Sequence, residues 1–471
     1  QKYMETKEQY KDCILFYRLG DFYEMFFDDA IVASKELEIA LTGKSCGLEE
    51  RAPMCGIPYH AVETYLARLV SRGYKVAICE QVEDPKLAKG LVKREVIRVV
   101  TPGTNLDVQS LEASKNNYLM CIAYTSDGIG ISAADVTTGD YYVTEVEDLR
   151  KLKDELMKYE PSEIICNEAF LVSGYDVEDL KSRLHMSVSS LESHMFDDDG
   201  CRRILMRHFK VNTLIGLGVE EFPTGILAAG ALLQYLYDTQ KTDLEHFTHI
   251  SPYLTSKYML LDSSTRRNLE LTETLREKQK RGSLLWVLDK TKTAMGGRLL
   301  RNYIEQPLID KEEMEKRLDA IQELNQDSIS RDEIREYLNP VYDLERLLSK
   351  VTYKTANPRD LIAFRNSLQM LPPIKTVLSG FQKEELAAIR EEIDGLEDIY
   401  QLIDEAIVEE PPISIREGGM IKDQFDETID HLRAAKHDGK QWLVQLEEED
   451  RERTGIKNLK IKKNNVFGYF F

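Results

Sequence analysis

Hydrophobic and polar positions repeat with different periods along the chain, and these periods predict its elements. The first hundred residues hold three β-rich runs, at 13–17, 75–79 and 96–100. Between them, residues 60–72 place apolar side chains on one helical face, and Gly73 suits a left-handed cap after that helix. The pattern therefore predicts a small mixed α/β domain over residues 1–105.

The next stretch, residues 116–245, predicts a second α/β domain. Strand-like runs occupy residues 118–124, 129–136, 141–146 and 164–166. Before the last of them, Leu149, Leu152 and Leu156 follow helical spacing. The order strand, strand, strand, helix, strand resembles a ribonuclease-H-like layout.

From residue 250 to 447 the pattern predicts an all-α region. Helical segments fall at residues 310–320, 359–370 and 384–393. A longer helix is predicted over 423–450, with a length of roughly 40 Å at 1.5 Å per residue. Residues 448–471 then return to alternating apolar and charged positions, which predicts the start of a β-structured domain.

Phe22 and Glu24 are the candidate site residues, because they stand two positions apart just after the first strand-like run. An exposed phenylalanine can enter a base step from the minor groove, and a step that is already weakened costs less to open. Glu24 is repelled by phosphates, so its functional interpretation requires a hydrogen bond to one base edge. The structural alternative places Phe22 and Phe26 in the core and Glu24 in solvent.

Longer stretches carry a family resemblance. They read FYRLGDFYEMFFDDA from Phe16, MCGIPYHAVETYLARLV from Met54, AICEQVEDP from Ala77, RVVTPGT from Arg98, LDSSTRRNLEL from Leu261 and RERTG from Arg451. The whole chain thereby resembles the MutS family of DNA mismatch-recognition proteins. In that family the Phe-x-Glu pair inserts at the mispair, which implies that Phe22 stacks on the mispaired base and Glu24 hydrogen-bonds to it.

The resemblance also implies an architecture and partners. It implies a mismatch-recognition domain, a connector, a helical lever bundle and the start of a β clamp. Family members bind double-stranded DNA with mismatches or small loops, form homodimers and recruit a MutL-type partner. Their ATP and magnesium belong to an ATPase domain that follows the clamp, so we expect a fragment with no cofactor and no enzymatic activity of its own.

Composition limits these expectations only slightly. The net charge is −20, which argues against nucleic-acid binding, but residues 1–105 hold 15 Lys and Arg against 16 Asp and Glu, a net charge of −1. The acidity therefore lies outside the proposed reader. The absence of a long apolar run and of a signal peptide predicts a cytoplasmic protein without membrane contact. Seven widely spaced cysteines suggest reduced thiols, most of them in the core.

Two short basic clusters are candidate contacts to the DNA backbone. The first contains Lys86, Lys89, Lys93 and Arg94, and the second contains Lys460 and Lys462. Both assignments rest on charge and not on the family motif. Short basic runs are often only solvated faces, so each cluster is a weak signal by itself.

Two motifs could indicate an enzyme instead. Gly43-Lys44-Ser45 fails the phosphate-loop pattern, because Glu38 stands where that pattern requires a glycine, and residues 43–47 are predicted to form a surface loop. A metal-dependent nuclease would use Asp135 at a strand end, but Asp140 lies past a turn and no second ligand is recognisable. We therefore predict no catalytic residue and no metal ligand, with a structural scaffold as the remaining alternative.

Overall fold

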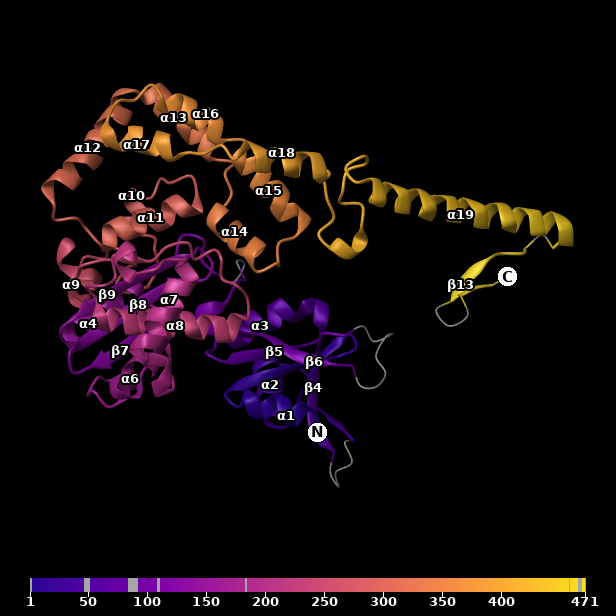
Figure 1. The fold of residues 1–471 in the computed structure, drawn as a ribbon, viewed down its shortest axis with the longest axis horizontal. Coiled ribbons are helices and arrows are strands. Elements are labelled where there is room, and N and C mark those ends of the chain that lie inside the picture. The colour runs from indigo at the N-terminus through magenta and orange to yellow at the C-terminus, as the bar shows by residue number, and fades with distance from the viewer. Residues whose placement is uncertain are drawn as a thin grey trace. The chain divides into compact units, whose positions relative to one another are not determined.

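A computed structural model describes residues 2–45, 51–83, 92–107, 111–182, 184–456, 458–464 and 468–470 (Figure 1). The chain forms two compact units. The larger unit contains Gln1–Ala356 and Met370–Asp394, and the smaller one contains Asn357–Gln369 and Gly395–Phe471. Both α/β domains predicted from the sequence lie in the larger unit.

The first sheet has six strands in the order β3-β4-β2-β1-β5-β6. Their bounds are β1 Cys13–Leu19, β2 Phe22–Phe26, β3 Thr42–Lys44, β4 Ala52–Pro58, β5 Lys75–Gln81 and β6 Arg94–Val100. Only the pair β1 and β5 is parallel among the ladders described. The predicted surface loop at 43–47 is wrong in its first part, because Gly43 and Lys44 pair with β4 as an edge strand. A three-residue strand is too short to show a period in the sequence.

Strand alternation gives this sheet a core on each face. One core packs under α2 (Phe27–Leu37) and α3 (Val62–Val70), and it includes Phe16, Met25 and Ile57, each 0% exposed. The other core contains Leu15 and Tyr17, against which Tyr3 of α1 (Lys2–Gln9) packs. A 3-10 turn, η1 (Tyr59–Ala61), leads into α3, so the predicted helix at 60–72 is shorter than expected. Gly73 does adopt a left-handed conformation, with φ of 89°.

The second sheet has the order β11-β10-β7-β8-β9-β12. Its strands are β7 Leu119–Thr125, β8 Gly128–Asp135, β9 Asp140–Val146, β10 Glu163–Cys166, β11 Ser187–Ser190 and β12 Ser251–Pro252. Its helices are α4 Leu149–Tyr159, α5 Glu168–Leu171, α6 Val177–Ser182, α7 Asp198–Phe209 and α8 Pro223–Gln240. The predicted order of three strands, a helix and a fourth strand is confirmed as β7, β8, β9, α4 and β10.

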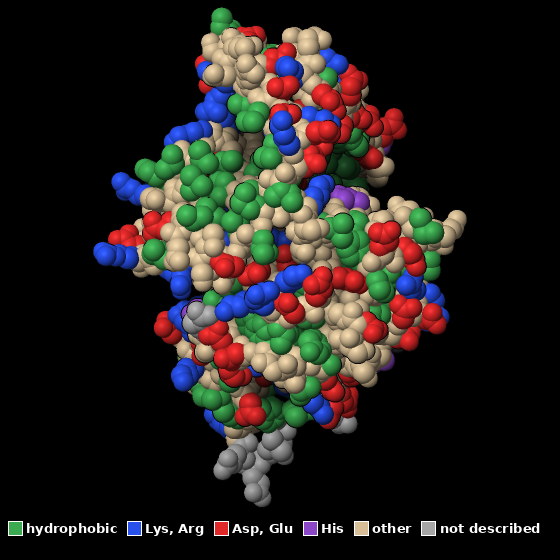
Figure 2. Space-filling view, turned by 90° about the vertical axis from the view of Figure 1, so that its left-hand side faces the viewer, with side chains coloured by type: hydrophobic (Ala, Val, Ile, Leu, Met, Phe, Trp, Pro, Cys, Tyr) green, Lys and Arg blue, Asp and Glu red, His purple; other side chains and the backbone are tan. Residues whose placement is uncertain are grey.

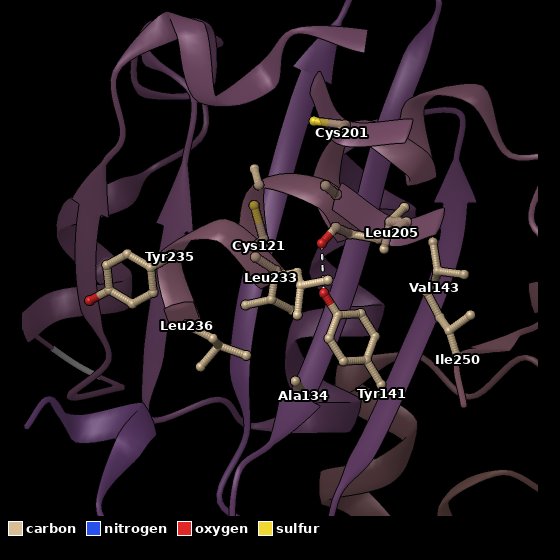
Figure 3. Close-up of a cluster of buried hydrophobic side chains, with 14 of the residues drawn as sticks. Cys121, Ala134, Tyr141, Val143, Cys201, Leu205, Leu233, Tyr235, Leu236 and Ile250 are labelled. Atoms are coloured by element: carbon tan, nitrogen blue, oxygen red, sulfur yellow. Dashed lines mark hydrogen bonds between the residues drawn. The ribbon is translucent and has the colours of Figure 1, made fainter. Parts of the chain in front are cut away.

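Helix α8 is apolar on most sides because it packs between this sheet and other elements. Leu232, Leu233 and Leu236 are each 0% exposed. Figure 3 shows Leu233 and Leu236 within this cluster. The hydroxyl of Tyr141 donates a hydrogen bond of 2.6 Å to the carbonyl of Ala229, which satisfies a buried polar group within this core (Figure 3).

A buried carboxylate joins the two sheets. Glu163 of β10 is 0% exposed and accepts hydrogen bonds from the backbone N–H of Gly103, at 3.0 Å, and from the hydroxyl of Tyr235, at 2.6 Å. Gly103 belongs to the turn η2 (Pro102–Thr104) that follows the first sheet. The ammonium of Lys75, at the start of β5, lies 3.8 Å from the same carboxylate. These contacts hold the first domain against the second.

The rest of the larger unit is helical, as predicted. It contains α9 Ser263–Asn268, α10 Leu284–Leu288, α11 Ala294–Glu305, α12 Lys311–Gln326, α13 Ser328–Leu338, α14 Leu344–Thr352, α16 Leu371–Leu378 and α17 Glu384–Glu392. Several begin at an Asp or Thr whose side chain accepts a hydrogen bond from the first helical turn, for example Asp310 before α12. Large apolar side chains on α10–α12, including Trp286, Leu299 and Leu318, are exposed. Hydrophobic side chains gather on the side of the molecule shown in Figure 2.

The smaller unit contains α15 Pro358–Leu368, α18 Glu397–Ala406, α19 Glu427–Thr454 and the hairpin strands β13 Lys462–Asn464 and β14 Gly468–Phe470. The predicted long helix at 423–450 exists, but its bounds were wrong. Asp426 caps α19 by accepting a hydrogen bond of 2.9 Å from Ile429 N–H, whereas Asp423 forms an ion pair of 2.8 Å with Arg433. Gly455, with φ of 69°, ends the helix.

Two predictions from composition can be compared with the described residues. Six cysteines are free and buried, as expected; Cys46 lies outside the described part. Among the helices described, none combines the length and the apolar character needed to cross a membrane.

Candidate nucleic-acid interface

The hairpin between β1 and β2 places Phe22 at an exposed end of the first sheet. Leu19 and Phe22 face each other across a two-residue turn, Gly20-Asp21, in which Gly20 has a φ of 60°. Glycine at the first position of such a turn adopts this angle without strain. The tight turn leaves the Phe22 ring at the end of the ladder with 48% of its surface exposed. The structural alternative in which Phe22 is buried is therefore wrong.

Alternation along β2 separates the site from the core. Tyr23 and Met25 point into the core under α2 and α3, whereas Phe22 and Glu24 lie on the other face. Phe26, which shares that other face, is 7% exposed and makes an edge contact with the ring of Tyr3. The structural alternative is thus confirmed for Phe26, which is buried, and wrong for Phe22. The reason is that α1 covers this face only at the end where Phe26 lies.

A glycine of β4, Gly56, lies beside the two candidate side chains. Gly56 of β4 pairs directly with Glu24, and Pro58 pairs with Phe22. A Cβ atom built on Gly56 would lie 3.7 Å from Glu24 Cγ and 4.0 Å from Phe22 Cδ1. Gly56 therefore leaves open a space of about one methyl group beside both side chains.

Glu24 is held in an ion pair on this face. Lys44 Nζ lies 2.6 Å from Glu24 Oε2, and the Glu24 side chain is 18% exposed. The same ammonium lies 5.4 Å from the centre of the Phe26 ring. The prediction of a freely solvated Glu24, which belonged to the structural alternative, is thereby corrected.

On the opposite face of the sheet, a network of polar side chains holds β2 in place. The Arg18 guanidinium stacks 3.9 Å from the centre of the Tyr59 ring and forms an ion pair of 3.1 Å with Glu80. The Tyr23 hydroxyl donates a hydrogen bond to the same carboxylate. Burial, followed by this hydrogen bond to Glu80, raises the pKa of Tyr23 well above its ordinary value. Tyr23 therefore stays neutral and keeps donating its proton.

The first basic cluster is only partly described. Lys86 and Lys89 lie outside the described residues. Lys93 is exposed and pairs with Glu95 at 2.6 Å, a hydrogen bond that raises the pKa of Lys93. Arg94 donates to the backbone carbonyl oxygens of Arg18, at 2.7 Å, and Val92, at 2.9 Å. Its guanidinium thus serves the domain's own structure, and its contact with DNA stays a prediction.

The second basic cluster belongs to the smaller unit. Lys460 is exposed, and Lys462 is exposed at the start of β13. No ion pair of either lysine is found in the part of the chain that the structure describes. Their proposed role as backbone contacts also stays a prediction.

Asp135 and Asp140, the residues of the nuclease alternative, face each other at the end of the β8–β9 hairpin. Asp135 is 0% exposed and accepts four hydrogen bonds, from Asn116 Nδ2, Asn117 N, Thr137 N and Thr137 Oγ1, at 2.7–3.0 Å. These donors occupy the carboxylate oxygens that a metal would need. No group of three potential ligands forms a metal site within the described ranges. Asp135 is therefore held by its own domain, and these contacts do not support the nuclease alternative.

Sequence reasoning missed Lys44 and Gly56 as parts of the site. In the sequence, Lys44 stands out only within Gly43-Lys44-Ser45, which fails the phosphate-loop pattern, and Gly56 belongs to no functional motif. Neither the spacing nor the residue type shows that Lys44 contacts Glu24, because the two meet only when β3 and β2 pair with opposite edges of β4. The signal that could have found Gly56 is the run MCGIP, in which a glycine interrupts a strand and indicates a close approach.

The order of the domains along the chain defines a class of modular proteins in which two α/β domains precede a helical region. Each of these three regions matches a family model: MutS domain I over residues 1–109, MutS domain II over 117–250 and MutS domain III over 264–464. The chain belongs to the MutS family.

Curated relatives agree along the whole chain. It is 65% identical over 470 residues to the DNA mismatch repair protein MutS of Lachnoclostridium phytofermentans, covering 100% of this chain and 50% of that protein. The proteins of the same name from Ruminiclostridium cellulolyticum and Acetivibrio thermocellus are 53% and 52% identical, over 100% of this chain and 54% of each relative. The chain spans about half the length of these relatives.

Proposed function

We propose that this chain recognises mispaired or looped double-stranded DNA for mismatch repair. The observation that carries the proposal is the placement of Phe22, half exposed at the end of the β1–β2 hairpin and on the same face as Glu24. A phenylalanine ring in that position can wedge into a base step. Such a wedge favours mispairs, because their stacking and pairing are weaker and the step opens at lower cost. Family membership supports the same conclusion.

Each site residue has a distinct role in the proposal. The Phe22 ring stacks against the mispaired base, and the Glu24 carboxylate accepts a hydrogen bond from its edge. Gly56 provides room beside both, since its backbone carries no side chain there. Lys93, Lys460 and Lys462 are proposed as contacts to the DNA backbone because they are exposed cations; Lys86, Lys89 and Arg94 are proposed on charge alone.

The wider cycle is proposed from family membership. A homodimer encloses the duplex, ATP and magnesium act in the ATPase domain that follows the clamp in the family, and a MutL-type partner is recruited. In this proposal the 471-residue chain supplies recognition and has no catalytic function, and the protein works in the cytoplasm.

The test is a titration of the chain against two labelled duplexes that differ only in one G·T mispair, at one stated salt concentration. We expect preference for the mispaired duplex, and we expect Phe22→Ala to remove it. Ile97→Ala is the matched control, because Ile97 is an apolar residue of the same sheet with 45% exposure and lies on β6, away from the hairpin.

Equal binding to both duplexes by a folded chain would contradict the proposal for this chain. Loss of preference in both variants would show that general damage to the sheet, and not the wedge, is responsible. Magnesium-dependent cutting that Asp135→Asn abolishes would instead support the nuclease alternative.

A further inference from the structure

Lys44 is placed against Glu24 by the sheet itself. It ends β3, an edge strand whose register is fixed by the pairs Thr42 with Met54 and Lys44 with Ala52. The Thr42 hydroxyl adds a hydrogen bond of 3.0 Å to the Met54 carbonyl. From this strand the Lys44 side chain reaches across β4 to Glu24 in β2, where the two charged groups lie 2.6 Å apart.

The pair leaves part of Glu24 available. The ammonium contacts Oε2, and in the described part of the chain no hydrogen bond to Oε1 is found. The Glu24 side chain is 18% exposed and the Lys44 side chain is 43% exposed, so the outer edge of the pair faces solvent. One carboxylate oxygen is therefore oriented by Lys44 while the other can accept a hydrogen bond from a base.

The positive charge of Lys44 also reduces the repulsion between the Glu24 carboxylate and the phosphates of DNA. A lone carboxylate that approaches a duplex is repelled by the phosphates on both strands. An ammonium 2.6 Å away cancels most of that field beyond the pair, so the carboxylate can enter the groove as half of a neutral unit. The Phe26 ring, 5.4 Å from the ammonium, helps to keep Lys44 in this position before any DNA arrives.

We infer that Lys44 is a positioning residue that acts through Glu24 and thereby sets the preference for mispaired over matched DNA. The inference rests on the proposed function of Phe22 and Glu24. It differs from a plain phosphate contact, in which Lys44 would strengthen binding to every duplex by a similar factor.

The experiment compares dissociation constants of the 471-residue chain for the G·T and matched duplexes across a salt series. The variants are Lys44→Met, which keeps most of the stem and removes the charge, Lys44→Arg, Glu24→Gln and the double variant Lys44→Met/Glu24→Gln. Lys35→Met is the matched control, because Lys35 is an exposed lysine on α2, under the opposite face of the sheet. Circular dichroism confirms that each variant is folded.

We expect Lys44→Met to reduce the mispair preference by about fivefold or more, the size of one lost base contact. The double variant should lose no more than Glu24→Gln alone, because both changes remove the same interaction. Lys44→Arg should retain most of the preference, and Lys35→Met should leave it unchanged.

Several outcomes would overturn the inference. Unchanged preference in Lys44→Met, or equal weakening of both duplexes with a shallower salt dependence, would make Lys44 a bystander or a phosphate contact. Increased preference would mean that the lysine competes with the base for Glu24. If the folded wild-type chain shows no preference at all, the proposed function itself fails for this chain, and the inference falls with it.

Discussion

The two six-stranded sheets each carry acidic residues at or near a hairpin end, but the two ends differ in how their polar groups are satisfied. At the β8–β9 end, Asp135 is fully buried and accepts four hydrogen bonds from its own domain. At the β1–β2 end, Glu24 has one ion-pair partner within the described residues, and Phe22 beside it is half exposed. The hydrogen bonds already made give Asp135 a structural role and leave Glu24 with unused acceptor capacity among the described residues.

Packing around one glycine in each sheet also differs. A Cβ atom on Gly130 of β8 would lie 1.9 Å from the Thr224 carbonyl oxygen, because α8 rests directly on the strand. A Cβ atom on Gly56 would meet only contacts of 3.4–4.0 Å. The second sheet is therefore closely covered at Gly130, whereas the first leaves space at Gly56.

The largest expected contrast is between two phenylalanines of the first hairpin. Phe16 is 0% exposed, so Phe16→Ala should lower the free energy of unfolding by about 3–5 kcal/mol. Phe22→Ala should lower it by less than about 1 kcal/mol, because the ring is already half exposed. Urea unfolding followed by circular dichroism measures both. Similar losses would mean that the Phe22 ring packs in the core.

A second contrast sets Asp135 against Glu24. Asp135→Ala leaves four donors near the β8–β9 turn without their acceptor, so we expect a loss of about 3 kcal/mol. Glu24→Ala removes one partly exposed ion pair and should cost less than about 1 kcal/mol. The midpoints of urea unfolding test this. A mild effect of Asp135→Ala would remove the structural role assigned to that carboxylate.

The glycines give a third contrast. Gly130→Ala must displace α8 from the sheet and should destabilise the chain by about 1–3 kcal/mol. Gly56→Ala should change the free energy of unfolding by less than about 1 kcal/mol, since its added methyl group meets no close contact. The midpoints of thermal unfolding of the two variants, compared with that of wild type, test this contrast. Equal destabilisation would show that the first sheet is packed as tightly as the second.

The smallest expected effect concerns Asp140. Burial, and then the charge of Asp135, raise the pKa of Asp140 to about 6 from an ordinary value of 3.8. The folded chain therefore keeps a proton there that the unfolded chain has released, and this group's contribution to stability is lost as pH rises from about 4 to 6. Asp140→Asn should reduce that pH dependence by about 1 kcal/mol. Urea midpoints at about pH 4.5 and about pH 6.5 measure it, and identical slopes in both proteins would contradict it.

Much of the fold could be predicted from local pattern. The strands around residues 118–146, α4 and the helical region were all found where apolar periodicity placed them. The short strand β3 was missed, and the start of α19 was placed too early. In both cases the local pattern is compatible with more than one set of bounds. A contact with another segment selects one of them, such as the pairing of β3 with β4.

Local pattern was enough to assign this chain to the MutS family and to select Phe22 and Glu24 as candidate site residues, because strand and helix periods and short motifs are local properties. Only the tertiary structure decided that Phe22 is exposed, that Asp135 is satisfied and that Lys44 pairs with Glu24. The Lys44–Glu24 pair and the bonds from Asn116 and Asn117 to Asp135 join residues 18–20 positions apart, which meet only after the strands have paired. Solvent exposure and hydrogen-bond partners follow from those contacts, and no local pattern encodes them.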